Sequence, residues 1–327
     1  MSIVDSNERP LKPSSVALAA ITSLNFVTGQ SRGLAYSAAT LRMKCIVMAQ
    51  SLRVGSLDTA KRTAERRRKG HNVIEIELQR RVWWCLVAGD WFCGASGGPN
   101  DGAYFFHPRH MNVRVPMNLE DEDLTPETME KDVTLSVPTS MTAAIVRVKL
   151  SQLYSVNFLH ELPVFFRLDA ESVDKSRDVC RDMPFIALQR VSLNLAIYGR
   201  LCRLHRPFHL QDVKMSRHKY AYSHEACLAD AQRLLDLRGM LEETGHLNGL
   251  QPTKSWIVVQ HVSVAALILA TEVSFDPTAP DAAARKNRVL ATCDDGTDWN
   301  QLWKDFISVA PEIDVSQWDV PFQDVAM

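Results

Sequence analysis

The sequence predicts an all-α protein, a multi-helix array with a long ordered loop after a tryptophan-rich helix. Apolar residues recur every three or four positions through several long segments, which places them on one side of a helix. Glycine and proline interrupt this pattern between the periodic segments, as they do from residue 97 to residue 116. The chain shows neither an internal repeat nor a strong signal for paired strands.

Two helices are expected near the N-terminus. The first follows Pro13, carries an apolar stripe over 16–27 and ends at Gly29. The second carries a longer stripe over 34–52 and ends near Gly55. Because a short link joins them, they are expected to pack as an antiparallel pair.

A third helix is expected from Val73 to Cys93, and it is apolar almost all round, as interior helices are. Trp83 and Trp84 are adjacent in it, so they are expected to pack against different partners. The aromatic stretch that follows, 104–116, contains two prolines and has no helical period. It is expected to form an ordered loop that includes one short strand.

Further helices are expected over 140–162, 184–205, 223–243, 255–273 and 299–307. The second of these is predicted to stop before Pro207, because proline lacks the N–H that a helix interior needs. The domain organisation is therefore a flexible N-terminal tail over 1–12, one helical domain over 13–310 and an acidic C-terminal tail over 311–327.

Composition limits the class of protein. Of 327 residues, 46% are hydrophobic and 23% are charged, which excludes disorder as the general state. With 37 basic and 38 acidic residues, the chain lacks the basic excess of a free-standing nucleic-acid binder. The apolar stretch 256–270 contains Gln260 and His261, so it is interpreted as a buried core helix. Neither secretion nor a membrane partner is expected.

The seven cysteines are scattered, which is typical of free thiols in a reducing compartment. A fungal zinc cluster needs six closely spaced cysteines, yet the nearest pair here is Cys85 and Cys93. We therefore predict no metal and no cofactor for this chain.

Two segments carry side chains that could do chemistry. His107, Pro108, Arg109 and His110 could ligate a metal, but the favoured interpretation is a loop whose polar groups satisfy its own backbone. Asp90 could be a catalytic carboxylate, but an ion pair is favoured because buried charges are rarely left alone. The arginines considered as its partner are Arg80, Arg81 and Arg109. His205 and His209 flank Pro207, so a two-histidine metal face is not expected there.

A basic run and an acidic tail remain. The run holds six cations, namely Lys61, Arg62, Arg66, Arg67, Arg68 and Lys69. It is either a nuclear import signal or DNA-backbone contact, or else a solvated loop, and the two interpretations have equal weight. In the tail, the bulky Trp318 and Phe322 favour docking on the body over a role as an activation segment.

A family resemblance rests on four motifs. They are E-L-Q-R-R-V-W-W-C-L-V-A-G-D-W at 77–91, G-G-P at 97–99, H-P-R-H-M-N-V at 107–113 and E-D-E-D-L at 120–124. Together they resemble the middle homology region of fungal zinc-cluster transcription factors. The signature residues are Arg80, Arg81, Trp83, Trp84, Asp90, Gly97, Gly98, Pro99, His107, Pro108, Arg109, His110 and Asn112.

Weaker landmarks at 28–37, 138–141, 204–208 and 220–231 extend the resemblance to about residues 15–275. One position departs from the family pattern. His224 stands where an arginine is common, which leaves open the polar contact expected there.

The resemblance implies a nuclear, α-helical regulatory body that takes part in transcription control, often of metabolic genes, and is not an enzyme. It would act through transcription-related proteins or a small effector. Relatives carry zinc in a module before this region, but only about a dozen residues precede the match here. Direct DNA binding is therefore not expected of this chain alone. The alternatives are a truncated or decayed family member, or an enzyme on this scaffold with Asp90 and His110 as acid and base.

Overall fold

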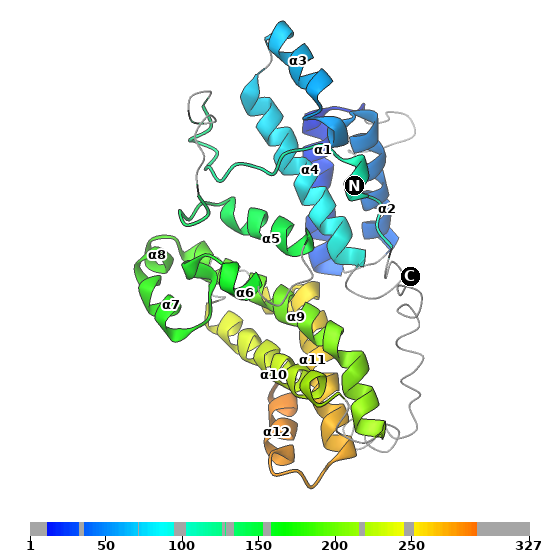
Figure 1. The fold of residues 1–327 in the computed structure, drawn as a ribbon, viewed down its shortest axis with the longest axis vertical. Helices are drawn as coiled ribbons and strands as arrows, with labels where there is room; N and C mark the ends of the chain where they lie inside the picture. Colours follow the sequence, from blue (N-terminus) through cyan, green and yellow to red (C-terminus); the bar gives the residue numbers. More distant parts are fainter. Residues whose placement is uncertain are drawn as a thin grey trace. The chain divides into compact units, whose positions relative to one another are not determined.

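The computed structural model describes residues 12–32, 36–70, 72–94, 103–125, 128, 134–152, 158–215, 220–244 and 252–292 (Figure 1). Within these ranges the chain forms helices, turns and irregular segments, and no strand. The all-α prediction is therefore confirmed. The short strand expected within 104–116 is wrong, because that stretch holds only a single turn of 3-10 helix.

Contacts between residues divide the chain into two compact units, Met1–Asp182 and Met183–Met327. The sequence predicts one helical domain over 13–310, and its boundaries stay a prediction. The predicted tails over 1–12 and 311–327 lie outside the described residues, apart from Lys12.

Unit 1 begins with α1 (Ser15–Arg32) and α2 (Tyr36–Ser51), which pack against one another as predicted (Figure 1). The Ser14 hydroxyl accepts a hydrogen bond from the Ala17 amide at 3.1 Å, so it caps the first turn. A 3-10 turn, η1 (Val54–Ser56), follows α2. The core of the unit joins α1 and α2 to the next long helix, with Phe106 of the loop added.

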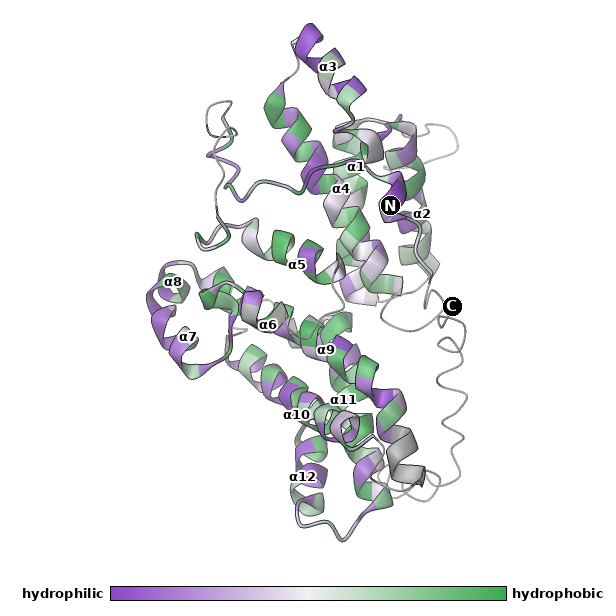
Figure 2. Ribbon diagram, in the orientation of Figure 1, coloured by the Kyte–Doolittle hydropathy of each residue, from purple (hydrophilic) through white to green (hydrophobic). Residues whose placement is uncertain are grey.

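The basic run forms a helix, α3 (Ala60–Lys69), so the loop conformation expected in one interpretation is wrong, whereas the choice between a solvated segment and an import signal or DNA-backbone contact stays open. Lysine and arginine favour helices, and Gly70 ends this one with a left-handed φ of 69°. No residue of α3 is buried, and Figure 2 shows it as mostly hydrophilic. α3 was not predicted because the segment has no apolar period.

The tryptophan-rich helix is α4 (Val73–Gly94), which confirms the predicted span. Trp83 packs edge-on against Phe106, with 4.9 Å between ring centroids, and Trp84 packs edge-on against Trp91. The two adjacent tryptophans therefore have different partners, as expected. α4 also packs on α1 and on the helix that follows the long loop.

The rest of unit 1 is a series of shorter elements. They are η2 (Pro108–His110), α5 (Thr142–Gln152), α6 (Phe158–Glu161), η4 (Val164–Phe166), α7 (Ala170–Lys175) and α8 (Arg177–Asp182). The predicted helix over 140–162 corresponds to α5 and α6, and residues 153–157 between them lie outside the described residues. Asp169 begins α7 by accepting the Ser172 amide at 2.9 Å.

Unit 2 consists of α9 (Pro184–Met215), α10 (Ala221–Thr244), η5 (Pro252–Lys254), α11 (Trp256–Phe275) and α12 (Ala282–Thr292). The predicted stop before Pro207 is wrong, because α9 continues through it. A proline costs a helix interior about 3 kcal/mol, and packing on α10 over much of the helix offsets that loss. The helix predicted over 299–307 lies outside the described residues.

α11 is the most apolar helix of unit 2 and packs on α9, α10 and α12. Its length and composition would also suit a membrane span, a test that core helices of soluble proteins pass as well. Its buried positions, Val258, Val262, Ala265 and Leu269 among them, recur at helical spacing and match the predicted core helix.

Candidate functional site

The signature residues of α4 form a charged edge on that helix. Glu77, Arg80 and Arg81 share one face because they are three and four positions apart. The Glu77 side chain is fully buried, with Oε2 3.2 Å from Arg80 Nη1 and Oε1 3.6 Å from Arg81 Nε. A buried carboxylate of this kind needs such partners, so the three residues act as a unit.

Asp58, on the link before α3, completes this charged edge. Arg80 binds it in a bidentate manner, with Nε 2.9 Å from Oδ2 and Nη2 2.6 Å from Oδ1. Arg66 of α3 adds a contact at 3.4 Å, and the Arg114 amide donates to Oδ2 at 2.8 Å. The same carboxylate therefore joins α3, α4 and the long loop. We call Asp58, Glu77, Arg80 and Arg81 the charged clamp.

The clamp holds the backbone of the long loop. The Met117 amide donates to Glu77 Oε1 at 2.8 Å, and Arg81 Nη2 donates to the Leu119 carbonyl at 2.7 Å. Arg81 also pairs with Asp121 in the acidic run. The loop has no ladder to satisfy its N–H and C=O groups, so side chains of α4 take that part.

Two tryptophans and Asp90 hold the loop further along α4. The indole of Trp84 donates to the Arg114 carbonyl at 2.7 Å, and that of Trp91 to the Phe106 carbonyl at 2.8 Å. Asp90 Oδ2 accepts the amides of Phe105 and Phe106, at 2.6 and 3.0 Å. These side chains therefore fix the course of the loop along the helix.

The predicted ion pair of Asp90 with Arg80, Arg81 or Arg109 is wrong. Arg80 and Arg81 serve the clamp, and the cation that acts on Asp90 is Arg42. Loop amides replace the predicted arginine, a pairing that residue spacing does not reveal.

The pKa values of Asp90 and Asp58 are shifted in opposite directions. Burial raises the pKa of Asp90 above its usual value, and the two loop amides and Arg42 only partly oppose that effect. Burial also acts to raise the pKa of Asp58, but Arg80 and the Arg114 amide reverse the effect and lower it. Burial similarly opposes the charge of Arg80, yet Asp58 and Glu77 raise the pKa of Arg80.

A hollow of about 260 Å³ lies where the loop meets α2, η1 and α4. Its lining is mainly apolar and aromatic, with Trp83, Phe105, Phe106 and Met111. Gly55 lets Trp83 approach, since a Cβ there would lie 2.7 Å from the indole ring. The Trp83 N–H is buried and has no hydrogen-bond partner among the described residues.

The H-P-R-H segment lies at this hollow. His107 and His110 line it, are both exposed, and have ring centroids 5.2 Å apart. His107 Nδ1 accepts the Arg109 amide at 3.2 Å, which fits the expected satisfaction of loop backbone by its own polar groups. Asn112 binds through its backbone, donating to the Gly55 carbonyl at 2.7 Å and accepting from the Asp58 amide. Gly97, Gly98 and Pro99 lie outside the described residues.

Asp90 and His110, the acid and base of the enzyme alternative, have separate surroundings. Asp90 is buried and does not line the hollow, whereas His110 is exposed at it. Two loop amides take up one oxygen of Asp90. The arrangement gives Asp90 a structural use.

The basic run of α3 divides into two groups. Arg62 and Arg66 donate to the carbonyls of Arg53 and Leu57, so they hold the turn before the helix. The other four cations, Lys61, Arg67, Arg68 and Lys69, are exposed. This second group is available to a partner.

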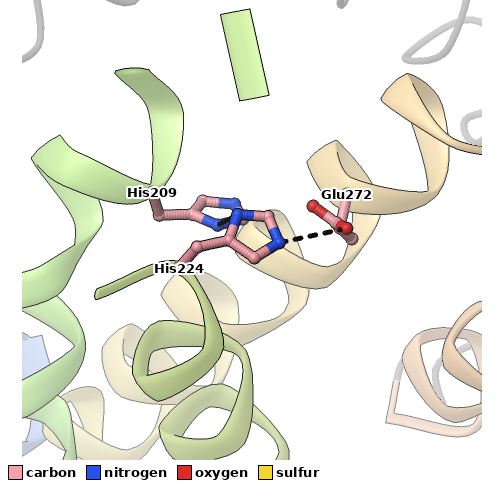
Figure 3. A group of neighbouring side chains, drawn as sticks. All are labelled: His209, His224 and Glu272. Carbon is pink, nitrogen blue, oxygen red and sulfur yellow. Dashed lines mark hydrogen bonds and ion pairs between the residues drawn. The ribbon is translucent and has the colours of Figure 1, made fainter. Parts of the chain in front are cut away.

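Unit 2 contains a cluster of ionisable side chains that was not predicted from the sequence. His209, His224 and Glu272 converge from α9, α10 and α11, with candidate ligand atoms within 4.8 Å of one another (Figure 3). His224, which stands where the family pattern has arginine, does make a polar contact, with Nε2 3.3 Å from Glu272 Oε1. His209 could not be placed on a helix from the sequence, because the helix was expected to end before Pro207, whereas α9 continues through it.

In the ranges that the structure describes, the fold is a helical body in which side chains of α4 hold a long loop. The chain is 28% identical to the probable transcription factor lepB of Aspergillus flavus over 325 residues, covering 90% of this chain and 57% of that protein. It is 28% identical to the agnestins biosynthesis cluster transcription factor AgnL11 of Paecilomyces divaricatus, covering 74% of this chain and 38% of that one. It is 29% identical to transcription factor TAS2 of Pyricularia oryzae, covering 61% and 31%.

The chain is thus similar to fungal transcription factors and is transcription-regulator-like, although it spans only about a third to just over half the length of these relatives. No protein-family model matches it, and no solved structure matches it significantly. The narrower assignment to the zinc-cluster middle region stays a prediction, as does the absence of a zinc cluster.

Proposed function

We propose that this chain is the helical regulatory body of a fungal transcription regulator, that it works in the nucleus, and that it has no enzymatic activity. The observation that carries the proposal is the similarity to fungal transcription factors over 90% of the chain. The clamp supports it, because the signature side chains of α4 are occupied in holding the loop. Such residues build a surface and a hollow rather than a reaction centre.

We propose that the body acts through transcription-related proteins or a small effector rather than by touching DNA itself. The net charge of −1 supports this, since phosphate contacts need a basic excess. The hollow beside Trp83 is the candidate effector site. Its one fully charged lining residue is Arg53, and its volume suits a ligand smaller than a typical drug molecule.

The exposed cations of α3 are the proposed nuclear import signal. The positive patch proposed here consists of the four exposed basic side chains of this short helix, of which Lys69 also pairs with Glu65 at 2.6 Å. Arg62 and Arg66 are excluded from the patch because they bind backbone carbonyls. The patch can therefore be changed without loosening the turn beneath it.

A tethering experiment tests function and import together. The 327-residue chain is fused to a DNA-binding module that has no import signal, and a reporter gene is measured in a fungal host. The fusion is expected to change reporter expression several-fold relative to the module alone. Replacing Lys61, Arg67 and Arg68 by glutamine should remove the change, and a foreign import signal should restore it.

The matched control replaces Lys175, Arg177 and Arg181 by glutamine, which removes the same charge from exposed positions of α7 and α8. It should leave the reporter response intact. Reporter expression equal to that of the module alone, even with a foreign import signal, would contradict the regulatory proposal. Trp83→Phe, which changes the lining of the hollow at a buried position, separates the two routes: a changed reporter response favours an effector, and an unchanged response favours protein partners.

A further inference from the structure

Unit 2 brings two histidines and a glutamate together from three helices. His209 lies near the end of α9, His224 in the first turn of α10, and Glu272 near the end of α11 (Figure 3). Because the three residues belong to three different helices, no local sequence motif predicts the group. In the part of the chain that the structure describes, this is the one group of three such side chains close enough to share an ion.

The distances suit a shared ion. His224 Nε2 lies 3.3 Å from Glu272 Oε1, and His209 Nδ1 lies 3.1 Å from His224 Nδ1. Around a tetrahedral ion with ligand bonds of about 2.0–2.1 Å, neighbouring donor atoms are separated by about 3.3–3.4 Å. These two contacts use different nitrogens of His224, and one imidazole gives an ion only one of them. The ion would therefore take one atom from each side chain, and those atoms lie within 4.8 Å of one another, so small side-chain adjustments would bring them around it.

Burial and an unsatisfied oxygen point to a ligand. His209 is fully buried, and the Glu272 side chain is 7% exposed. Glu272 Oε2 is buried and has no hydrogen-bond partner among the described residues. A buried carboxylate oxygen without a partner is costly, and an ion bound to it would supply the missing interaction.

The neighbouring arginine contacts only one of the two oxygens of Glu272. Arg285 of α12 lies 3.6 Å from Glu272 Oε1, and its other nitrogen binds Asp281. The arginine therefore faces the oxygen that already contacts His224. The second oxygen, Oε2, is the one left for an ion, so the arginine and the ion would use different oxygens of Glu272.

We propose that His209, His224 and Glu272 form a binding site for a divalent transition-metal ion of the Zn²⁺ type. Two imidazoles and one carboxylate are the donors that such ions prefer, whereas Ca²⁺ and Mg²⁺ prefer an all-oxygen set. The ion would tie α9, α10 and α11 together, and solvent would supply a fourth ligand. The site is separate from the proposed regulatory function and does not depend on it.

The test is metal titration of the full chain. Chelator-treated protein is titrated with Zn²⁺ by calorimetry, and with Co²⁺ to read the ligand set from its absorption. One equivalent is expected to bind, with visible Co²⁺ bands typical of nitrogen and oxygen ligands and without a thiolate charge-transfer band. The absorption matters because the chain has seven cysteines, which are competing ligands.

Glu272→Gln and His224→Arg are the decisive variants. Each should weaken Zn²⁺ binding more than about 100-fold, since loss of an outer-shell partner alone costs 10–100-fold. His224→Arg places a cation beside Glu272 to limit unfolding, and circular dichroism checks that the variant is folded. The matched control, His107→Gln with His110→Gln, removes two exposed histidines and should leave binding unchanged.

Three results would overturn the proposal. They are the absence of stoichiometric Zn²⁺ binding by the folded chain, Co²⁺ spectra dominated by thiolate, and unchanged affinity in a folded Glu272→Gln or His224→Arg variant. In each case the three side chains would be a buried hydrogen-bonded group only.

Discussion

The two units solve the problem of buried polar groups in different ways. In unit 1 a long irregular loop lies along α4, and charged side chains together with tryptophan N–H groups satisfy its backbone. In unit 2 long helices pack through apolar faces and satisfy their own backbones. An irregular segment needs side-chain partners, whereas a helix needs them only at its ends. Substitutions of polar side chains should therefore reduce the stability of unit 1 most. Substitutions that change side-chain volume should reduce the stability of unit 2 most.

The largest effect is expected from breaking the clamp. Arg80→Met leaves Asp58 and Glu77 buried without their shared partner, and loss of one member of such a pair costs about 3–5 kcal/mol. Amide hydrogen exchange over residues 103–125 measures the result, because the loop should open before the rest of the chain unfolds.

The control for the clamp is Arg177→Met. Arg177 pairs with Asp174 at 2.6 Å, but both side chains are at least 70% exposed. Exposed pairs contribute at most about 1 kcal/mol, so exchange in the loop should not change. If Arg80→Met and Arg177→Met behave alike, burial is not what makes the clamp strong.

Sequence periodicity predicted the long helices because their apolar residues face a core at regular spacing. α4, α10 and α11 are examples, with ends within about two residues of the prediction. It failed where no apolar period exists, as in α3, and where packing overrides a local rule, as at Pro207. In both cases the prediction used only local residue types, whereas the packing of the folded chain determined where the helix forms.

The candidate sites were predicted unevenly for the same reason. The family motifs marked Arg80, Arg81, Trp84 and Asp90 as special, but not what they bind. Their partners are mostly backbone groups of the loop, which carry no sequence signal. The histidine cluster of unit 2 depends on the packing of three helices, so spacing along the chain could not reveal it.

An intermediate effect is expected from overpacking unit 2. A Cβ at Gly199 would lie 2.3 Å from His261 Nδ1, so Gly199→Ala forces the ring or α9 to move. Such overpacking costs about 1–3 kcal/mol. Gly239→Ala in α10 is the matched control, because nothing lies within 4 Å of the added carbon. It should instead stabilise by about 0.5–1 kcal/mol, since alanine favours helix. Urea unfolding measures the change in the free energy of unfolding for both variants. A change of the same sign in both would contradict the prediction.

The last contrast between the units is one of sign rather than size, and it concerns the pH dependence of two aspartates. In unit 2, burial raises the pKa of Asp230 to about 7, against an unfolded value of about 3.9. Its folded state therefore favours the proton. The penalty is absent below about pH 4, grows as the pH rises towards 7, and is constant above that. Asp230→Asn should remove it, so the variant should exceed the parent chain in stability at pH 8 and equal it at pH 4.

Asp58 in unit 1 should show the opposite sign. Its pKa is lowered in the folded state, so its contribution is present above the unfolded value and is lost as the pH falls through the folded one. Asp58→Asn should therefore destabilise the chain most at neutral pH and least in acid. Urea unfolding is measured at pH 4, 6 and 8 for the Asp230 variant and at pH 2, 3 and 5 for the Asp58 variant, because the pKa of Asp58 lies below its usual value. The two stability differences should change with pH in opposite directions. If both stability differences change with pH in the same direction, Asp230 has a cationic partner as Asp58 does. The two units would then stabilise buried polar groups in the same way.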